Sequence, residues 1–281
     1  MTIRTLPGAP QGGRRSGYHR QTALEQVYAT YHRRSYVVPD PLAFLYDYPD
    51  LADREIVGLI ASALAYGKVA RIMVSVGDVL RRMGPSPADY VDHTPPERMR
   101  RHMVGFVHRF ADAAAMAALL GAVRSVRCEC GGLNTCFHGA IAPEDDTVIP
   151  ALGRFVDFLQ HFGAGGHLLP HPEKGSACKR LHLFLRWMVR CDDVDPGGWD
   201  AVAPAMLIIP LDVHMHRIGR ALGFTRRRAA DRRTALEVTA GFRAIVPEDP
   251  VKYDFSLTRL GIRPECDLDA FLSGLTECGR Q

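Results

Sequence analysis

The sequence predicts an all-α fold. Apolar residues recur at steps of three and four positions through several long segments, which is the spacing of one helix face. Few stretches combine period-two alternation with β-branched residues, so strands are not expected. The chain has 281 residues, of which 47% are hydrophobic and 23% charged, and this composition is typical of a globular protein with its own core.

The first 19 residues differ from the rest of the chain. They are rich in glycine, proline and arginine and contain no apolar run, so they do not form a secretory signal. We expect residues 1–19 to be a disordered basic arm before a single domain over residues 20–281. No segment has the length and apolarity of a membrane span, and we expect a monomer.

Five helices are predicted from periodicity. They cover residues 53–67, 68–84, 110–126, 149–162 and 176–191. Asp53 is the expected N-cap of the first, and Gly84 ends the second. The glycine- and proline-rich residues 163–177 form the expected seam between two parts of the domain. Ser176 is the expected N-cap of the fifth helix, which would place Lys179 in its first turn.

Lys179 is therefore a candidate nucleophile. The positive end of a helix disfavours an ammonium ion, and a neutral lysine amine can attack carbon. A surface lysine would have the same sequence context.

The segment "LIIPLDVHMHRIGRAL" (207–222) carries a dense group of polar residues. Asp212 follows Pro210 and precedes a helical run, so we expect it at or near the N-cap. His214 and His216 would then lie about 200° apart around the helix axis, because each residue turns by about 100°. Such a pair cannot share one metal ion from a single helix. A metal-dependent hydrolase using the two histidines is kept as the third interpretation.

The seven cysteines are odd in number and irregularly spaced, which fits free thiols in the cytoplasm. Cys128, Cys130, Cys136 and His138 offer four soft ligands, so a zinc site stays open at this point. Their spacing is not a paired Cys-x-x-Cys, however, and Gly131–Gly132 fits a turn before a helix. We expect no metal and no cofactor.

Two segments together resemble the helix-hairpin-helix DNA glycosylase superfamily, "KRLHLFLRWMVR" (179–190) and "IIPLDVHMHRIGRALGF" (208–224). The superfamily's P-x-D-x-H-x-x-R segment, which contains a catalytic aspartate, is matched by Pro210, Asp212, His214 and Arg217. Lys179 precedes Asp212 by 33 positions, a separation similar to that in archaeal 8-oxoguanine glycosylases. The chain is also similar to a bacterial family that shares "DPLAFLYDYPD", "LFLRWMVR" and "YDFSLTRLGI".

The resemblance implies a two-lobed helical fold with a cleft, and release of a modified base flipped out of duplex DNA. Asp212 would stabilise the positive charge that develops on the sugar. If Lys179 points into the cleft, it would form a Schiff base and add abasic-site lyase activity; otherwise water would attack. The implied DNA- and base-binding residues are Tyr66, Lys68, His214, Arg217, Arg220, Arg226, Arg227 and Arg228.

The base itself is left open. An oxidised purine follows from the nearest branch, and a hypermodified base such as a modified cytosine of phage DNA is an equal alternative. A non-catalytic DNA-binding helical protein is the second interpretation. The chain departs from the superfamily in its hairpin, where "LLPHPEKGSACKR" keeps only the outline, and in the missing four-cysteine motif. After "TRLGIRPEC" only Cys266 and Cys278 remain, so no iron–sulfur cluster is expected.

Overall fold

The computed structural model describes residues 12–262 together with residues 268 and 271. The described part is mostly helical, as predicted. The elements of its first half are α1 (Gly12–Tyr31), η1 (Arg34–Tyr36), η2 (Pro41–Asp47), α2 (Leu51–Ala63), α3 (Val69–Met83), α4 (Pro87–His93), α5 (Pro96–His102), β1 (Val107–His108), β2 (Ala111–Asp112) and α6 (Ala113–Cys130). Those of its second half are α7 (Leu133–Gly139), α8 (Val148–His161), η3 (Pro172–Lys174), α9 (Lys179–Val189), η4 (Pro204–Met206), α10 (Val213–Ala221), α11 (Arg232–Arg243) and α12 (Asp254–Ile262).

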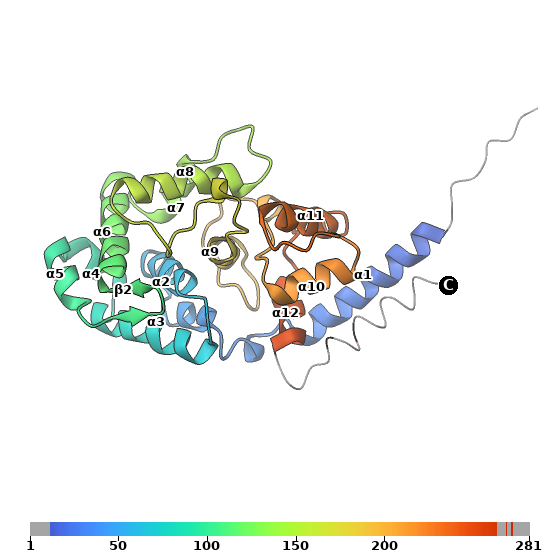
Figure 1. Ribbon diagram of the computed structural model, residues 1–281, viewed down its shortest axis with the longest axis horizontal. Coiled ribbons are helices and arrows are strands. Elements are labelled where there is room, and N and C mark those ends of the chain that lie inside the picture. The colour runs from blue at the N-terminus through green and yellow to red at the C-terminus, as the bar shows by residue number, and fades with distance from the viewer. Residues whose placement is uncertain (1–11, 263–267, 269–270, 272–281) are drawn as a thin grey trace, which may run out of the picture.

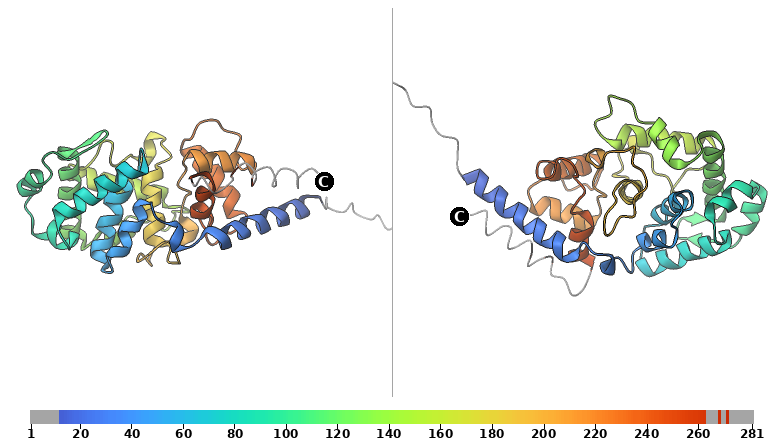
Figure 2. Two further views of the ribbon diagram at one scale, coloured as in Figure 1. Left: turned by 90° about the horizontal axis from the view of Figure 1, so that it is seen from below. Right: turned by 180° about the vertical axis from the view of Figure 1, so that it is seen from behind.

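Helix α9 lies at the centre of the molecule (Figure 1). Helices α2 to α8 lie on one side of it, and α10, α11, α12 and α1 lie on the other. Helix α9 crosses α2 closely at Gly58, where an added Cβ would lie 3.3 Å from atoms of both Phe184 and Met188. The N-terminal half of α1 projects beyond the other helices in all views (Figure 2).

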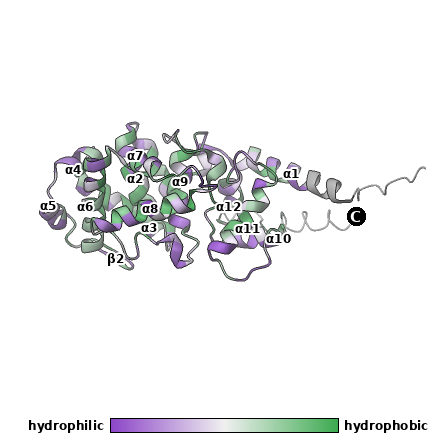
Figure 3. Ribbon diagram, turned by 90° about the horizontal axis from the view of Figure 1, so that it is seen from above, coloured by the Kyte–Doolittle hydropathy of each residue, from purple (hydrophilic) through white to green (hydrophobic). Residues whose placement is uncertain are grey.

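The core is continuous from α2 to α12. Leu181, Phe184, Leu185 and Met188 of α9 are buried, and so are Trp187 and Trp199, each 1% exposed. Helix α2 at the centre is largely hydrophobic, whereas the peripheral α5 is largely hydrophilic (Figure 3). Among the described residues, no helix is both long and apolar enough to cross a membrane.

Helix ends are only partly as predicted. Gly84 ends α3 with φ of 88°, which confirms that stop. The expected cap Asp53 was wrong, because Asp50 caps α2 by accepting a hydrogen bond from the Ala52 amide at 2.7 Å. Asp53 instead accepts hydrogen bonds from the start of α4, including one from the Ala88 amide at 2.7 Å.

Two further expectations need correction. Helix α1 begins at Gly12, so the disordered arm predicted over residues 1–19 is wrong from residue 12 onward, and residues 1–11 lie outside the described residues. A short antiparallel hairpin, β1–β2, lies in a region where no strand was expected. It pairs only two residues on each side, too few for period-two alternation to be visible in the sequence.

Candidate active site

A cavity of about 200 Å³ lies where the ends of several helices meet. Its wall comes from the start of η2, the segment between α2 and α3, one face of α9, the start of α10 and one face of α12. Lys179, Asp212 and Tyr66 all line it. The fold therefore brings together three of the site residues predicted from separate parts of the chain.

Lys179 is the first residue of α9, in the first turn as expected. The helix begins differently, however, because the N-cap is Cys178 and not Ser176. Cys178 has φ of 44°, in the left-handed region, and the Ser176 hydroxyl accepts a hydrogen bond from its amide at 3.2 Å. Lys179 is half-buried and makes no ion pair with any described residue. A strained turn of this kind is common where a fold must aim one side chain.

Tyr66 is held at the cavity wall by contacts on several sides. Its hydroxyl donates a hydrogen bond to the His108 carbonyl at 2.8 Å. Its ring meets the His108 and His167 rings edge-on, at 4.7 and 4.5 Å between centroids. The Arg180 guanidinium lies 4.8 Å from the Tyr66 ring centroid and donates to the Ala63 carbonyl at 2.6 Å. The start of α9 is thereby tied to the end of α2.

Asp212 is the N-cap of α10, which confirms the predicted position. One carboxylate oxygen accepts a hydrogen bond from the Met215 amide at 2.8 Å. The side chain is half-buried and lines the cavity. Because the helix N-terminus carries partial positive charge, negative charge on Asp212 is stabilised there.

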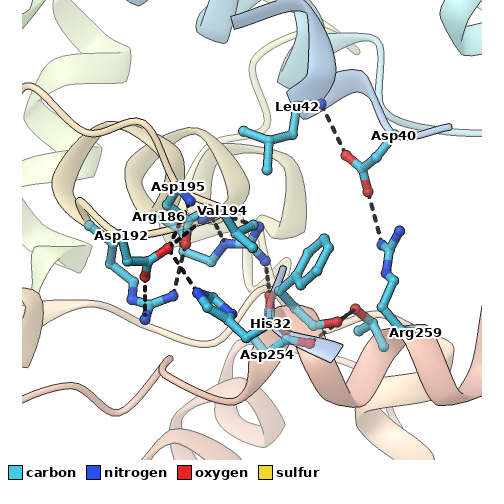
Figure 4. A network of polar contacts seen from close by, with 12 residues as sticks. His32, Asp40, Leu42, Arg186, Asp192, Val194, Asp195, Asp254 and Arg259 are labelled. Carbon is cyan, nitrogen blue, oxygen red and sulfur yellow. Dashed lines mark hydrogen bonds and ion pairs between the residues drawn. The ribbon is translucent and has the colours of Figure 1, made fainter. Parts of the chain in front are cut away.

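Four charged residues of the cavity were not predicted: Asp40, Arg186, Asp254 and Arg259. They form two ion pairs that join distant segments (Figure 4). The Arg186 guanidinium donates to Asp254 at 2.5 Å, and that of Arg259 donates to Asp40 at 2.9 Å. The available signal was a charged residue inside an apolar helical run, as in "LFLRWMVR" and "YDFSLTRLGI".

Arg186 also pairs with the buried Asp195 at 3.1 Å. Asp195 in turn accepts from Arg190 at 2.8 Å, and this second arginine contacts Asp192 and Asp249. Burial raises the pKa of Asp195, and the two arginines oppose that shift. The ion pairs hold α9 against the segment that follows it, because a buried charge without a partner costs several kcal/mol.

A shallow basic groove of about 500 Å³ begins one residue after Asp212. It is lined by Val213, His216, Arg217, Arg220, Ala221, Thr225 and Arg226. The fold therefore groups three of the predicted DNA-binding residues, Arg217, Arg220 and Arg226, on one surface.

The other predicted binding residues lie apart from this groove. Arg227 is half-buried and paired with Asp231 at 2.5 Å, which makes it part of the start of α11. Arg228 is exposed outside the groove. Lys68 is exposed at the N-terminus of α3, beside the cavity-lining Gly67 and Val69.

His214 and His216 have separate neighbours. His214 packs on α12, where a Cβ on Gly261 would lie only 2.3 Å from its Nδ1. His216 donates from Nε2 to the Arg227 carbonyl at 3.0 Å. No metal-binding group of three or more His, Cys, Asp or Glu side chains is present among the described residues.

The cysteine-rich segment spans the turn between α6 and α7. Gly131 has φ of 83° at this turn, as its position in the sequence predicted. Cys128 is exposed, and Cys136 is buried beside Cys130. Burial raises the pKa of Cys136 to about 12, so its thiol is protonated at neutral pH. Cys266 and Cys278 lie outside the described residues.

Fold and site together define a mostly helical protein with a charged cavity between the start of α10 and one face each of α9 and α12. The chain belongs to the family described as "Protein of unknown function (DUF2400)", whose family model matches residues 40–263. The matched range includes every charged residue of the cavity, from Asp40 to Arg259. No curated protein and no solved structure matches the chain.

Proposed function

We propose that the protein is a DNA glycosylase that accepts a flipped, modified base in the cavity between α9, α10 and α12. One observation carries the proposal: Lys179 and Asp212, separated by 33 positions in the sequence, line the same cavity. Its volume of about 200 Å³ is below the range of about 300–1,000 Å³ that is common for drug-sized ligands. A single nucleobase is a ligand of suitable size.

The two-lobed fold with a cleft, which the resemblance implies, is part of this proposal. The helices on the two sides of α9 would be the two lobes, and the cavity would be the cleft between them. Support comes from the arrangement in Figure 1 and from the position of the cavity-lining elements on both sides.

The proposed chemistry uses the three predicted residues in separate roles. The Lys179 amine attacks C1′ of the sugar as the bond from C1′ to the base breaks and its electron pair leaves with the base. The Asp212 carboxylate stabilises positive charge on the sugar. Tyr66, at the wall, contacts the extruded base. Opening of the sugar ring then forms a Schiff base, and β-elimination cleaves the strand.

Two surface features support binding of duplex DNA. The basic groove of α10 offers Arg220 and Arg226 to phosphates next to the cavity. The β1–β2 turn carries Arg109 and Phe110, and the Phe110 side chain is 72% exposed. The Arg109 side chain lies about 3 Å from the Cβ position of Gly67, which lines the cavity. A cation and an aromatic ring thus stand at the rim, where stacked bases would pass.

Borohydride trapping tests the Lys179 role. Duplex oligonucleotides that carry 8-oxoguanine, 5-hydroxymethylcytosine or an abasic site are incubated with the protein and reduced. We expect a covalent adduct with the wild type and with Lys174→Gln, an exposed lysine in η3, and none with Lys179→Gln. Base release without any adduct would assign attack to water and remove the lyase step.

The released base identifies the substrate. Genomic DNA in different modification states is incubated with the protein, and freed bases are identified by mass spectrometry. DNA affinity without release of any base, and without an effect of Asp212→Asn, would contradict the enzyme proposal and favour a non-catalytic DNA-binding protein.

A further inference from the structure

Asp254 is the first residue of α12 and one of the residues that line the cavity. The residue is 1% exposed. One carboxyl oxygen accepts the hydrogen bond from Arg186 at 2.5 Å (Figure 4). The other oxygen is buried and has no hydrogen-bond partner among the described residues. A buried polar atom without a partner, in a residue that lines a cavity, is a candidate contact for a ligand.

In the described part of the chain, Asp254 has a single arginine partner in its network of ion pairs. Two arginines, Arg186 and Arg190, form ion pairs with four carboxyl groups among the described residues. These belong to Asp192, Asp195, Asp249 and Asp254. Asp195 receives both arginines, whereas Asp254 receives only Arg186.

Burial, together with the carboxylate of Asp212 on α10, raises the pKa of Asp254 to about 6. Arg186 on α9 opposes this shift, and Asp195 adds to it. In the second ion pair of the cavity, Arg259 pairs with Asp40 at 2.9 Å and not with Asp254. A carboxyl group in these surroundings holds its proton through the mildly acidic range.

Asp212 has different surroundings in the same cavity. It is half-buried, and it accepts a backbone hydrogen bond at a helix N-terminus. Two carboxyl groups whose environments differ in this way take separate acid and anion roles in many active sites.

We propose that Asp254 is a second catalytic carboxyl group, which donates its proton to the departing base while Asp212 stabilises the sugar as an anion. This inference rests on the proposed glycosylase function. As the bond from C1′ to the base breaks, its electron pair goes to the base, and a base nitrogen or oxygen takes the Asp254 proton. The Asp254 carboxylate, stabilised by Arg186, then accepts a proton from the new secondary ammonium between Lys179 and C1′. The acid is thereby regenerated, and the net products are the protonated base and the neutral Lys179 adduct.

Base release by this route requires the protonated form of Asp254. The acid form of Asp254 exists below about pH 6. Attack by Lys179 needs the neutral amine in base release and in abasic-site cleavage alike, so the ratio of the two rates follows the acid form and should fall about tenfold per pH unit above pH 6. Cleavage of a pre-formed abasic site has no base to protonate and provides the reference rate.

The experiment measures both rates between pH 5 and pH 8 in single-turnover reactions, using duplexes with 8-oxoguanine, 5-hydroxymethylcytosine or an abasic site. We expect Asp254→Asn to lower the ratio of base release to abasic cleavage by about 10²–10⁴-fold and to abolish the fall above pH 6. Asp195→Asn is the matched control, because it removes a buried partner of the same Arg186 but does not line the cavity. It should keep the fall.

Three outcomes would overturn the inference. A wild-type ratio of base release to abasic-site cleavage that is level between pH 5 and pH 8 contradicts it without any variant, so a variant that fails to fold does not remove the test. An unchanged ratio in Asp254→Asn, or the loss of the pH effect in Asp195→Asn as well, contradicts it too. Absence of base release by the wild type from any substrate instead refutes the proposed function itself.

Discussion

Asp212 combines two roles that substitutions can separate. Its carboxylate caps α10 through a 2.8 Å hydrogen bond to the Met215 amide, and it also faces the cavity. Asparagine caps a helix about as well as aspartate, so Asp212→Asn should change the free energy of unfolding by less than about 0.5 kcal/mol. Asp212→Ala loses the cap, at a cost of about 1 kcal/mol. In a domain of this size that cost lowers Tm by about 2–4 °C.

The rate of base release should depend on the negative charge of Asp212 and not on the stability of the protein. Both substitutions remove the anion near the developing sugar cation, and we expect single-turnover base release to fall by about 10²–10³-fold in each. The rate is measured from freed base by chromatography, and Tm by thermal melting. Asp112 is the matched control, since it caps α6 with the same geometry: it accepts from the Ala115 amide at 2.8 Å and is exposed. Asp112→Ala should lower the free energy of unfolding by a similar amount and leave the rate of base release unchanged.

Full base release in Asp212→Asn would refute the electrostatic role of Asp212, since only the charge is removed there. That role would equally be refuted if Asp112→Ala lost base release to the same extent, because the effect would then come from stability.

Three further predictions concern the wall and the core. Tyr66→Ala should weaken binding of DNA with an extruded base by about 1–3 kcal/mol in a titration, whereas Tyr66→Phe, which keeps the ring, should lose far less. Burial lowers the pKa of His182 to about 4. The contribution of this residue to the free energy of unfolding is therefore fully present above pH 6.5 and falls by about 3 kcal/mol as the pH falls towards 4. In urea unfolding, the free energy of unfolding of His182→Leu should therefore fall less between pH 7 and pH 4 than that of the wild type. An equal fall in both proteins would contradict this. Gly219→Ala places a Cβ 2.6 Å from Val238 and should destabilise by about 1–3 kcal/mol, whereas Gly121→Ala, with open space around it, should not.

Errors at helix ends show how far local signals reach. Asp50 and Asp53 are both possible caps of α2, and the sequence pattern favoured the wrong one because Asp53 is used by α4, 35 positions away at Ala88. Ser176 was likewise a plausible cap, and the left-handed Cys178 that replaces it has no sequence signature. Caps are recognised well only when no distant segment competes for the same side chain.

The sequence by itself determined the helical class, the positions of α2, α3, α6, α8 and α9, and the N-cap role of Asp212, because periodicity and capping depend on residues within a few positions of each other. Only the tertiary structure decided the cavity and its unpredicted charges. Asp40 meets Arg259 across 219 positions, and Arg186 meets Asp254 across 68. Such pairs are created by helix packing, and the burial that gives Asp254 its raised pKa exists only once α9, α10 and α12 have come together.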